Sequence, residues 1–329
     1  MKTRIIIIVL LLASWSSMAQ QQNVSGIVKL RGTRLTYPLV NKWIEEFKKE
    51  FPAIQVSISP SSPADSIDFS IASYPIETSD LKENQSFAIV ANYVQLLIIN
   101  PNRSSIDELL AKGVTEKDLG ELFFQPAPAF LASASNTSTL YIRDRPVCAV
   151  KAFADHYGVD PKEIKGTGIK GDDLDLAESV KSDVNGIAFN NLGFIYEVNT
   201  RKVKEGLVVV PLDLNSNGKV DSDEQIYGSL DQLIHYIEHS KSKAFINSPV
   251  NFVYEKNSQN KSAALFLNWV LSKGQKYNHE LGFINQEASQ LEEQKKNTVA
   301  IWGTLSSQPS CEGTTTLMKD RKAKQASNP

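Results

Sequence analysis

Apolar residues recur at helical spacing between residues 37 and 51, with charged residues between them. The apolar positions are Val40, Trp43, Ile44, Phe47 and Phe51. Spacings of three and four residues place these side chains on one face of a helix. The pattern predicts an amphipathic helix that lies on a sheet, with Thr36 as its N-cap and Pro52 at its end.

Short apolar runs alternate with further helical patterns along the chain. Strands are predicted at 26–30, 54–59, 67–72, 87–100, 140–143, 186–189 and 207–210. Helices are predicted at 106–112, 116–124, 150–157, 174–181, 230–239 and 261–273. The strand at 93–99 is almost entirely apolar, as is typical of a strand covered on both faces. This alternation predicts an α/β fold.

Two regions depart from this pattern. Residues 125–139 are rich in Pro, Ala and Ser, which predicts a surface loop. Residues 306–329 are polar and end in a Lys-rich stretch, which predicts disorder.

The N-terminus has the pattern of an export signal. Lys2 and Arg4 precede an apolar run over 5–13, and Ser17-Met18-Ala19 places a cleavage site before Gln20. A membrane-spanning helix is the alternative, but the run is shorter than the roughly 20 residues that cross a bilayer. We therefore expect residues 1–19 to be a cleaved signal peptide and the protein to be periplasmic.

Charge and cysteine content narrow the possible functions. Without Lys2 and Arg4 the chain has 33 Lys plus Arg against 37 Asp plus Glu, a net charge of about −4, so bulk attraction of nucleic acid is not expected. Cys148 and Cys311 could form a disulfide in an oxidising compartment, but they need not. About 310 mature residues are enough for two lobes, each with its own core.

Several short pieces follow one another in an order typical of a known family. They are Gly32-Thr33 with Tyr37-Pro38-Leu39 and Trp43; Ile67-Asp68-Phe69 with Pro75; Asn100-Pro101; Lys112-Gly113-Val114-Thr115 with Asp118-Leu119; Arg143 ten residues before Phe153; Gly186-Ile187 with Asn190-Asn191; Ser248-Pro249; and Trp269-Val270-Leu271 with Gly274-Gln275. Over residues 26–285 the chain resembles the phosphate ABC transporter substrate-binding protein family.

The resemblance implies a two-lobed periplasmic binding protein fold of type II, a Venus flytrap whose chain crosses between the lobes twice. Lobe 1 would comprise 20–99 and 247–305, and lobe 2 would comprise 100–246. The ligand would be an anion, phosphate or a related oxyanion, which the protein delivers as a monomer to a membrane ABC permease.

Carrying the family's pattern onto this sequence implies six ligand-binding residues. They are Gly32, Thr33, Arg34, Ser73, Arg143 and Arg145. Turn N–H groups, hydroxyls and Arg side chains are the groups that bind oxyanions. The sequence departs from the family pattern at three places. Val147-Cys148-Ala149 replaces a Ser-Gly-Thr run, Ser73 lies near the position of an Asp, and the Gly- and Ser-rich loop between the second and third strands is only Ser59-Pro60-Ser61-Ser62-Pro63.

Residues 213–224 match the twelve-residue calcium loop of EF-hands at every defined position. The predicted ligands are Asp213, Asn215, Asn217, Lys219, Asp221 and Glu224. Because residues 207–211 read as a strand, we expect a rigid structural calcium site and no helix-pair switch. A turn rich in Asn, Asp and Gly that never binds metal is the alternative.

Motifs of catalysis are missing from the sequence. His235 and His239 flank Glu238 without forming a His-Glu-x-x-His zinc motif, and there is no nucleophile elbow or phosphate-binding loop. We therefore expect a binding protein without a catalytic cofactor. A two-lobed interaction or sensory module that has lost anion binding is the alternative, and an exported hydrolase is a third, weaker hypothesis.

Overall fold

The computed structural model describes residues 25–125, 138–145, 147–240 and 242–302. Residues 24–303 group into one compact unit. The predicted signal peptide at 1–19, most of the predicted loop at 125–139, Cys311 and the predicted disordered tail at 306–329 lie outside the described residues. None of the described helices combines the length and apolar character that crossing a bilayer requires.

The described strands form one mixed sheet in the order β2-β1-β3-β9-β4-β7-β5-β6, with β8 and β10 paired to β4. Their bounds are β1 Gly26–Gly32, β2 Ile54–Ile58, β3 Phe69–Ala72, β4 Gln85–Ile99, β5 Thr139–Arg143, β6 Thr167–Ile169, β7 Gly186–Asn191, β8 Val208–Val209, β9 Ile246–Glu255 and β10 Phe283–Ile284. Strand β1 runs parallel to β2 and β3, and β5 runs parallel to β6 and β7. Strand β9 lies antiparallel between β3 and β4.

The helices are α2 Tyr37–Glu50, α3 Ile106–Lys112, α4 Glu116–Phe124, α6 Cys148–His156, α7 Asp173–Ser182, α8 Leu192–Ile195, α9 Leu230–His239, α10 Lys261–Ser272 and α11 Ala288–Trp302. The α/β prediction is confirmed, and α3, α4 and α9 have the predicted bounds. Thr36 is the N-cap residue of α2 as predicted, but its side chain makes no capping hydrogen bond, because its Oγ1 donates to the Thr33 carbonyl. Strand β9 and helix α11 were not predicted as elements.

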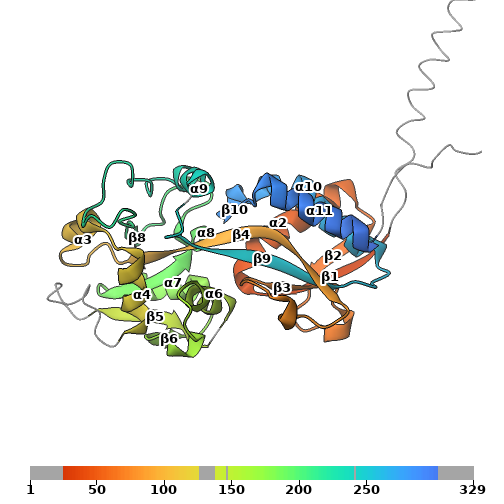
Figure 1. Cartoon of the computed structure of the whole chain (residues 1–329), viewed down its shortest axis with the longest axis horizontal. Helices are drawn as coiled ribbons and strands as arrows, with labels where there is room; N and C mark the ends of the chain where they lie inside the picture. Colours follow the sequence, from red (N-terminus) through yellow and green to blue (C-terminus); the bar gives the residue numbers. More distant parts are fainter. Residues whose placement is uncertain (1–24, 126–137, 146, 241, 303–329) are drawn as a thin grey trace, which may run out of the picture. The chain divides into compact units, whose positions relative to one another are not determined.

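Two hydrophobic cores lie along this sheet. The first core contains Trp43, Phe47 and Phe252 and is covered by α2, α10 and α11 (Figure 1). In the second core Phe153 stacks on Phe189, with ring centroids 4.1 Å apart, and Phe123 lies edge-on to both. Stacked and edge-to-face arrangements of this kind add to the burial energy of the rings.

The chain passes between the cores within strands β4 and β9. In β4 the first core ends with Tyr93 and the second begins with Val94. In β9 Ile246 belongs to the second core and Val250 to the first. The lobe boundaries expected at 99/100 and 246/247 remain predictions. In β4 the change from one core to the other lies about six residues before the expected boundary, and in β9 it lies between Ile246 and Val250.

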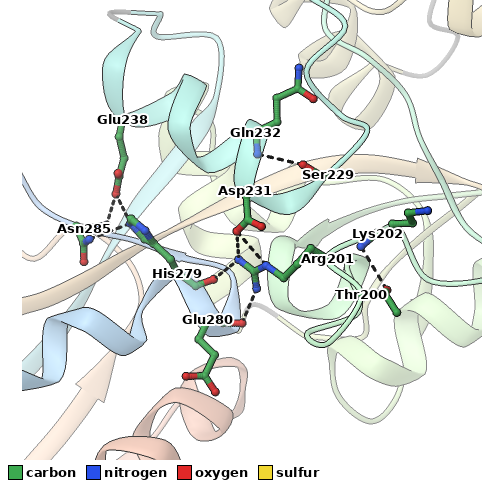
Figure 2. A network of polar contacts seen from close by, with 10 residues as sticks. All are labelled: Thr200, Arg201, Lys202, Ser229, Asp231, Gln232, Glu238, His279, Glu280 and Asn285. Atoms are coloured by element: carbon green, nitrogen blue, oxygen red, sulfur yellow. Dashed lines mark hydrogen bonds and ion pairs between the residues drawn. The ribbon is translucent and has the colours of Figure 1, made fainter.

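A polar network connects α9, in the second core, to the short 3₁₀ helix η6 (His279–Leu281) and to β10. Arg201 donates to Asp231 Oδ1 at 2.6 and 3.0 Å, and to the carbonyls of Glu280 and His279 at 2.8 and 2.7 Å (Figure 2). At the other end of α9, Glu238 Oε1 lies 2.7 Å from His279 Nε2. Both ends of α9 are therefore tied to one segment.

We predict that Arg201→Ala lowers the free energy of unfolding by about 1–2 kcal/mol, because two carbonyls lose a charged donor. Arg201 also has a left-handed backbone, with φ of 60°. Arg201→Gly should therefore lose less stability than Arg201→Ala. Urea unfolding measures both variants, with the exposed neighbour Lys202→Ala as control. Equal stability of Arg201→Ala and the unchanged protein would contradict the role of this network.

Candidate functional site

Buried polar residues gather where the two cores meet, and Tyr93 lies among them. We call Ser73, Tyr93, Gln95, Arg143, Cys148, Asp173 and Ser248 the junction cluster. The Tyr93 hydroxyl donates to the Ser73 carbonyl at 2.9 Å and accepts from Gln95 Nε2 at 3.3 Å. Burial raises the pKa of Tyr93 well above its usual value, and the nearby Asp173 charge acts in the same direction. Tyr93 thus stays a neutral hydroxyl that connects several elements.

Two acceptors of the cluster are buried without a hydrogen-bond partner among the described residues. Gln95 is 2 % exposed and its Nε2 also donates to the Ala149 carbonyl at 3.0 Å, but its Oε1 has no donor. The Ser73 side chain is fully buried and its Oγ is unpaired as well. Because an unpaired buried polar atom costs about 1–3 kcal/mol, such atoms are typical of sites that a ligand completes.

Arg143, the last residue of β5, is a buried cation with unused donors. It is 7 % exposed, and Nη2 donates to the Gly171 carbonyl. Within the described part of the chain, Nε and Nη1 have no acceptor. An anion placed against these two nitrogens would complete their hydrogen bonding.

Asp173 begins helix α7 close to Arg143. Its carbonyl accepts a hydrogen bond from Asn190 Nδ2 at 2.7 Å, which fixes the start of the helix against β7. Burial raises the pKa of the Asp173 carboxyl to about 6, and the nearby Arg143 charge opposes this rise. The two groups therefore interact electrostatically, yet they form no direct ion pair in the described structure.

Helix α6 brings the second core against the first. Its Ala149 and Ala152 pack in the first core, whereas Val150 and Phe153 pack in the second. Lys151 Nζ lies 3.9 Å from the ring centroid of Tyr74 across the junction. Cys148, the first residue of α6, is half-buried and forms no disulfide among the described residues, and an apolar helix start replaces the hydroxyl-rich one of the family pattern.

Two of the six predicted ligand residues are buried. Ser73 and Arg143 belong to the junction cluster. Gly32 is the last residue of β1, and Thr33 follows it at the start of the turn, where Thr33 N donates to the Ile71 carbonyl at 3.3 Å. Arg34 is exposed in this turn. Arg145 is 74 % exposed and lies 3.5 Å from Asp144, so it is a surface ion pair.

Sequence reasoning missed Tyr93, Gln95, Asp173 and Ser248. One signal was present, because Gln95 interrupts an otherwise apolar stretch of β4 that is covered on both faces. A polar side chain at such a position needs a buried partner, so it marks either a network or a site.

The predicted calcium loop folds around its own acidic side chains. Asp213 accepts from the N–H groups of Asn217 and Gly218 at 3.1 and 2.7 Å, and Glu224 accepts from Leu214 N at 2.8 Å. The Lys219 ammonium lies 2.6 Å from Asp221 Oδ1. No group of three or more His, Cys, Asp or Glu side chains suited to a metal ion occurs in the part of the chain that the structure describes. Calcium binding stays a prediction.

An open groove of about 460 Å³ lies elsewhere, on the outer side of β1 and β9. Its lining includes Ile27, Lys29, Asp68 and Glu255 and no residue of the junction cluster. Asp68 is already engaged there by Lys29 N and Asn260 Nδ2 at 2.8 and 2.7 Å. None of the buried atoms that lack a partner in the described part of the chain belongs to this groove, whereas four of them belong to the junction cluster.

Comparison with known proteins gives structural likeness alone. No family model and no curated protein sequence matches the chain. A putative phosphate ABC transporter substrate-binding protein with bound phosphate from Clostridium perfringens is 14 % identical, with a TM-score of 0.61 over 80 % of this chain and 100 % of that one.

Two further solved structures are similar. An ABC-type phosphate transport receptor from Vibrio cholerae is 10 % identical, with a TM-score of 0.56 over 79 % of this chain and 100 % of that one. A possible phosphate binding protein from Planctomyces limnophilus is 16 % identical, with a TM-score of 0.52 over 84 % and 99 %. The fold inferred from the sequence is thereby confirmed: the chain has the fold of phosphate ABC transporter substrate-binding proteins.

We predict that Asp173 makes stability depend on pH. A carboxyl whose pKa is raised by folding binds its proton more tightly in the folded state, so stability falls as pH rises from about 4 to about 6 and then levels off. Asp173→Asn should remove this loss, so the free energy of unfolding should rise by about 3 kcal/mol at pH 7 but by little at pH 4. Urea unfolding at pH 4 and pH 7 measures this effect. The same difference in unfolding free energy between Asp173→Asn and the unchanged protein at both pH values would contradict the prediction.

Proposed function

We propose that this protein is an exported solute-binding protein that captures a small anion, phosphate or a related oxyanion, at the junction cluster. The observation that carries the proposal is Arg143, a buried guanidinium with two nitrogens that lack acceptors among the described residues. A buried charge without a partner is costly, so a fold that retains one favours a bound counter-charge.

The fold supports the same role. The similar structures are a substrate-binding protein with bound phosphate and a phosphate transport receptor, by their own descriptions. We infer that this chain likewise binds its ligand without catalysis, acts as a periplasmic monomer after cleavage of residues 1–19, and delivers the ligand to an ABC permease.

An interaction or sensory module is the second candidate function. The observation that favours it is the start of α6, where Val147-Cys148-Ala149 offers an anion no hydroxyl. The two candidates differ in one measurable property, because the module would not bind a small anion.

We predict that the protein from Gln20 onward, stripped of bound anion by partial unfolding, binds phosphate with micromolar affinity at low ionic strength in isothermal titration. Arg143→Ala should weaken binding at least about 30-fold, since a buried charged contact is lost. The exposed Arg145→Ala is the matched control and should bind as before. No heat with any of several oxyanions would favour the interaction module.

We also propose that loop 213–224 binds Ca²⁺ as a structural ion. Asp213 and Glu224 are each only 3 % exposed, and Gly218 at the sixth position has the positive φ of 89° that the turn requires. Carboxylate oxygens that accept a backbone N–H keep further lone pairs for a cation.

We predict that millimolar Ca²⁺ raises the melting temperature of the protein and that a chelator reverses the rise. Asp213→Ala should abolish the effect, whereas Asp223→Ala, at an exposed position of the loop that is not a predicted ligand, should preserve it. Calorimetry that detects no heat with Ca²⁺ would refute the site.

A further inference from the structure

Lys151 of helix α6 contacts an aromatic ring of the first core. Its Nζ lies 3.9 Å from the ring centroid of Tyr74, the second residue after β3. Tyr74 packs against the first core, whereas Phe153, two residues after Lys151, packs in the second. A cation over the face of a tyrosine ring is attracted by the quadrupole of the ring. The contact therefore holds the two cores together at this place.

Buried amides of the crossing strands hold the backbone on both sides of this contact. Asn251, which is fully buried in β9, donates from Nδ2 to the Tyr74 carbonyl at 2.8 Å. Gln95 in β4 donates to the carbonyl of Ala149, two residues before Lys151, at 3.0 Å. Strands β4 and β9 thus place the two partners opposite each other, and the long lysine side chain completes the contact.

Lys151 has a second partner on its own helix. Its Nζ lies 3.4 Å from Asp155 Oδ2, four residues further along α6. The two side chains are 39 % and 33 % exposed, so this ion pair is partly solvated and weak. Because Asp155 belongs to the same helix, it stays beside Lys151 when the ring contact breaks. The contact with Tyr74 can therefore open and close without leaving an isolated charge.

The cores are joined more firmly at the other side of the crossing strands. In Figure 1, α9 and β10 lie on one side of β4 and β9, and α6 and β3 lie on the other. On the α9 side, Arg201 donates to the carbonyls of His279 and Glu280 at 2.7 and 2.8 Å, and Leu281 of the same segment packs against the first core.

These two connections differ in strength. A hydrogen bond of a charged group changes an equilibrium constant more than about tenfold. A cation over a half-exposed ring changes it about two- to fivefold. The two cores therefore separate more easily at Lys151 than at Arg201.

We propose that Lys151 and Tyr74 form a latch between the two cores, which opens on the side of α6 while Arg201 holds the side of α9. Ser73, a predicted ligand residue, directly precedes Tyr74, so an open latch gives an anion access to the junction cluster. The latch itself does not depend on the proposed function, but its effect on anion binding rests on that function. Lys151 and Tyr74 act as positioning residues, because they bring the cores together without touching the anion.

The separation of the cores is measurable without a ligand. Lys48 on α2 and Lys117 on α4 are exposed positions, one beside each core. Spin labels at Lys48→Cys and Lys117→Cys, in a chain with Cys148→Ser and Cys311→Ser, report this separation by pulsed electron paramagnetic resonance. We expect one distance for the latched arrangement and longer distances for the open one.

Variants of the two partners test the latch. Lys151→Met removes the charge and should lower the latched population relative to the open one about two- to fivefold. Tyr74→Leu should do the same, and the two changes together should add nothing, since either removes the same contact. Lys151→Arg and Tyr74→Phe keep the cation and the ring and should keep the latched population. Circular dichroism checks that each variant folds, and Lys162→Met, at an exposed position outside the contact, is the matched control.

The dissociation rate of phosphate, measured by stopped flow, is the second readout. Dissociation from Lys151→Met should be about two- to fivefold faster than from the unchanged protein. If Lys151→Met changes neither the distances nor this rate, or if Lys151→Arg has as large an effect, the latch is overturned and the proposed anion site is untouched. If no oxyanion binds the unchanged protein, the proposed function fails and the distances alone decide on the latch.

Discussion

The structure depends on the burial of polar side chains where strands β4 and β9 pass from one hydrophobic core to the other. Tyr93 in β4 lies opposite Ser248 in β9 and reaches the Ser73 carbonyl after β3. Its hydroxyl thus connects three neighbouring strands at a buried position. Apolar side chains could fill this junction at a lower free-energy cost of burial. The presence of polar side chains therefore calls for a functional reason.

Helix α6 contacts both cores and so connects the buried polar junction to the second core. Its alanines face the first core and its larger residues face the second, and Gln95 fixes its first turn through the Ala149 carbonyl. Small side chains allow the helix to approach the strands closely, while Phe153 anchors it among the aromatic rings beyond. The network around Arg201 ties α9 and η6 together away from these contacts, so the two cores are joined by more than the crossing strands.

Charge placement separates this junction from the hydroxyl-rich site that the sequence pattern implies. Arg143 remains at the end of β5, but the run before α6 is Val147-Cys148-Ala149 and the residue after β3 is Ser73. The carboxyl at the site comes from Asp173 on α7 instead. The same fold therefore presents one cation, one carboxyl and amide groups, a combination whose net charge is small and whose hydrogen bonding is mixed.

The sequence by itself determined the α/β alternation and the helices at 106–112, 116–124 and 230–239, and it singled out Arg143 and Ser73 as predicted ligand residues. These features depend on local periodicity, on the Thr115–Asp118 capping box, or on a resemblance in residue order. Strand β9 escaped prediction because Asn247, Pro249 and Asn251 interrupt its apolar positions, and its place between β3 and β4 is set by strand pairing. Only the tertiary structure decided that Arg34 and Arg145 are exposed and that Asp173 and Gln95 join the cluster, because burial and long-range contacts depend on how distant elements pack.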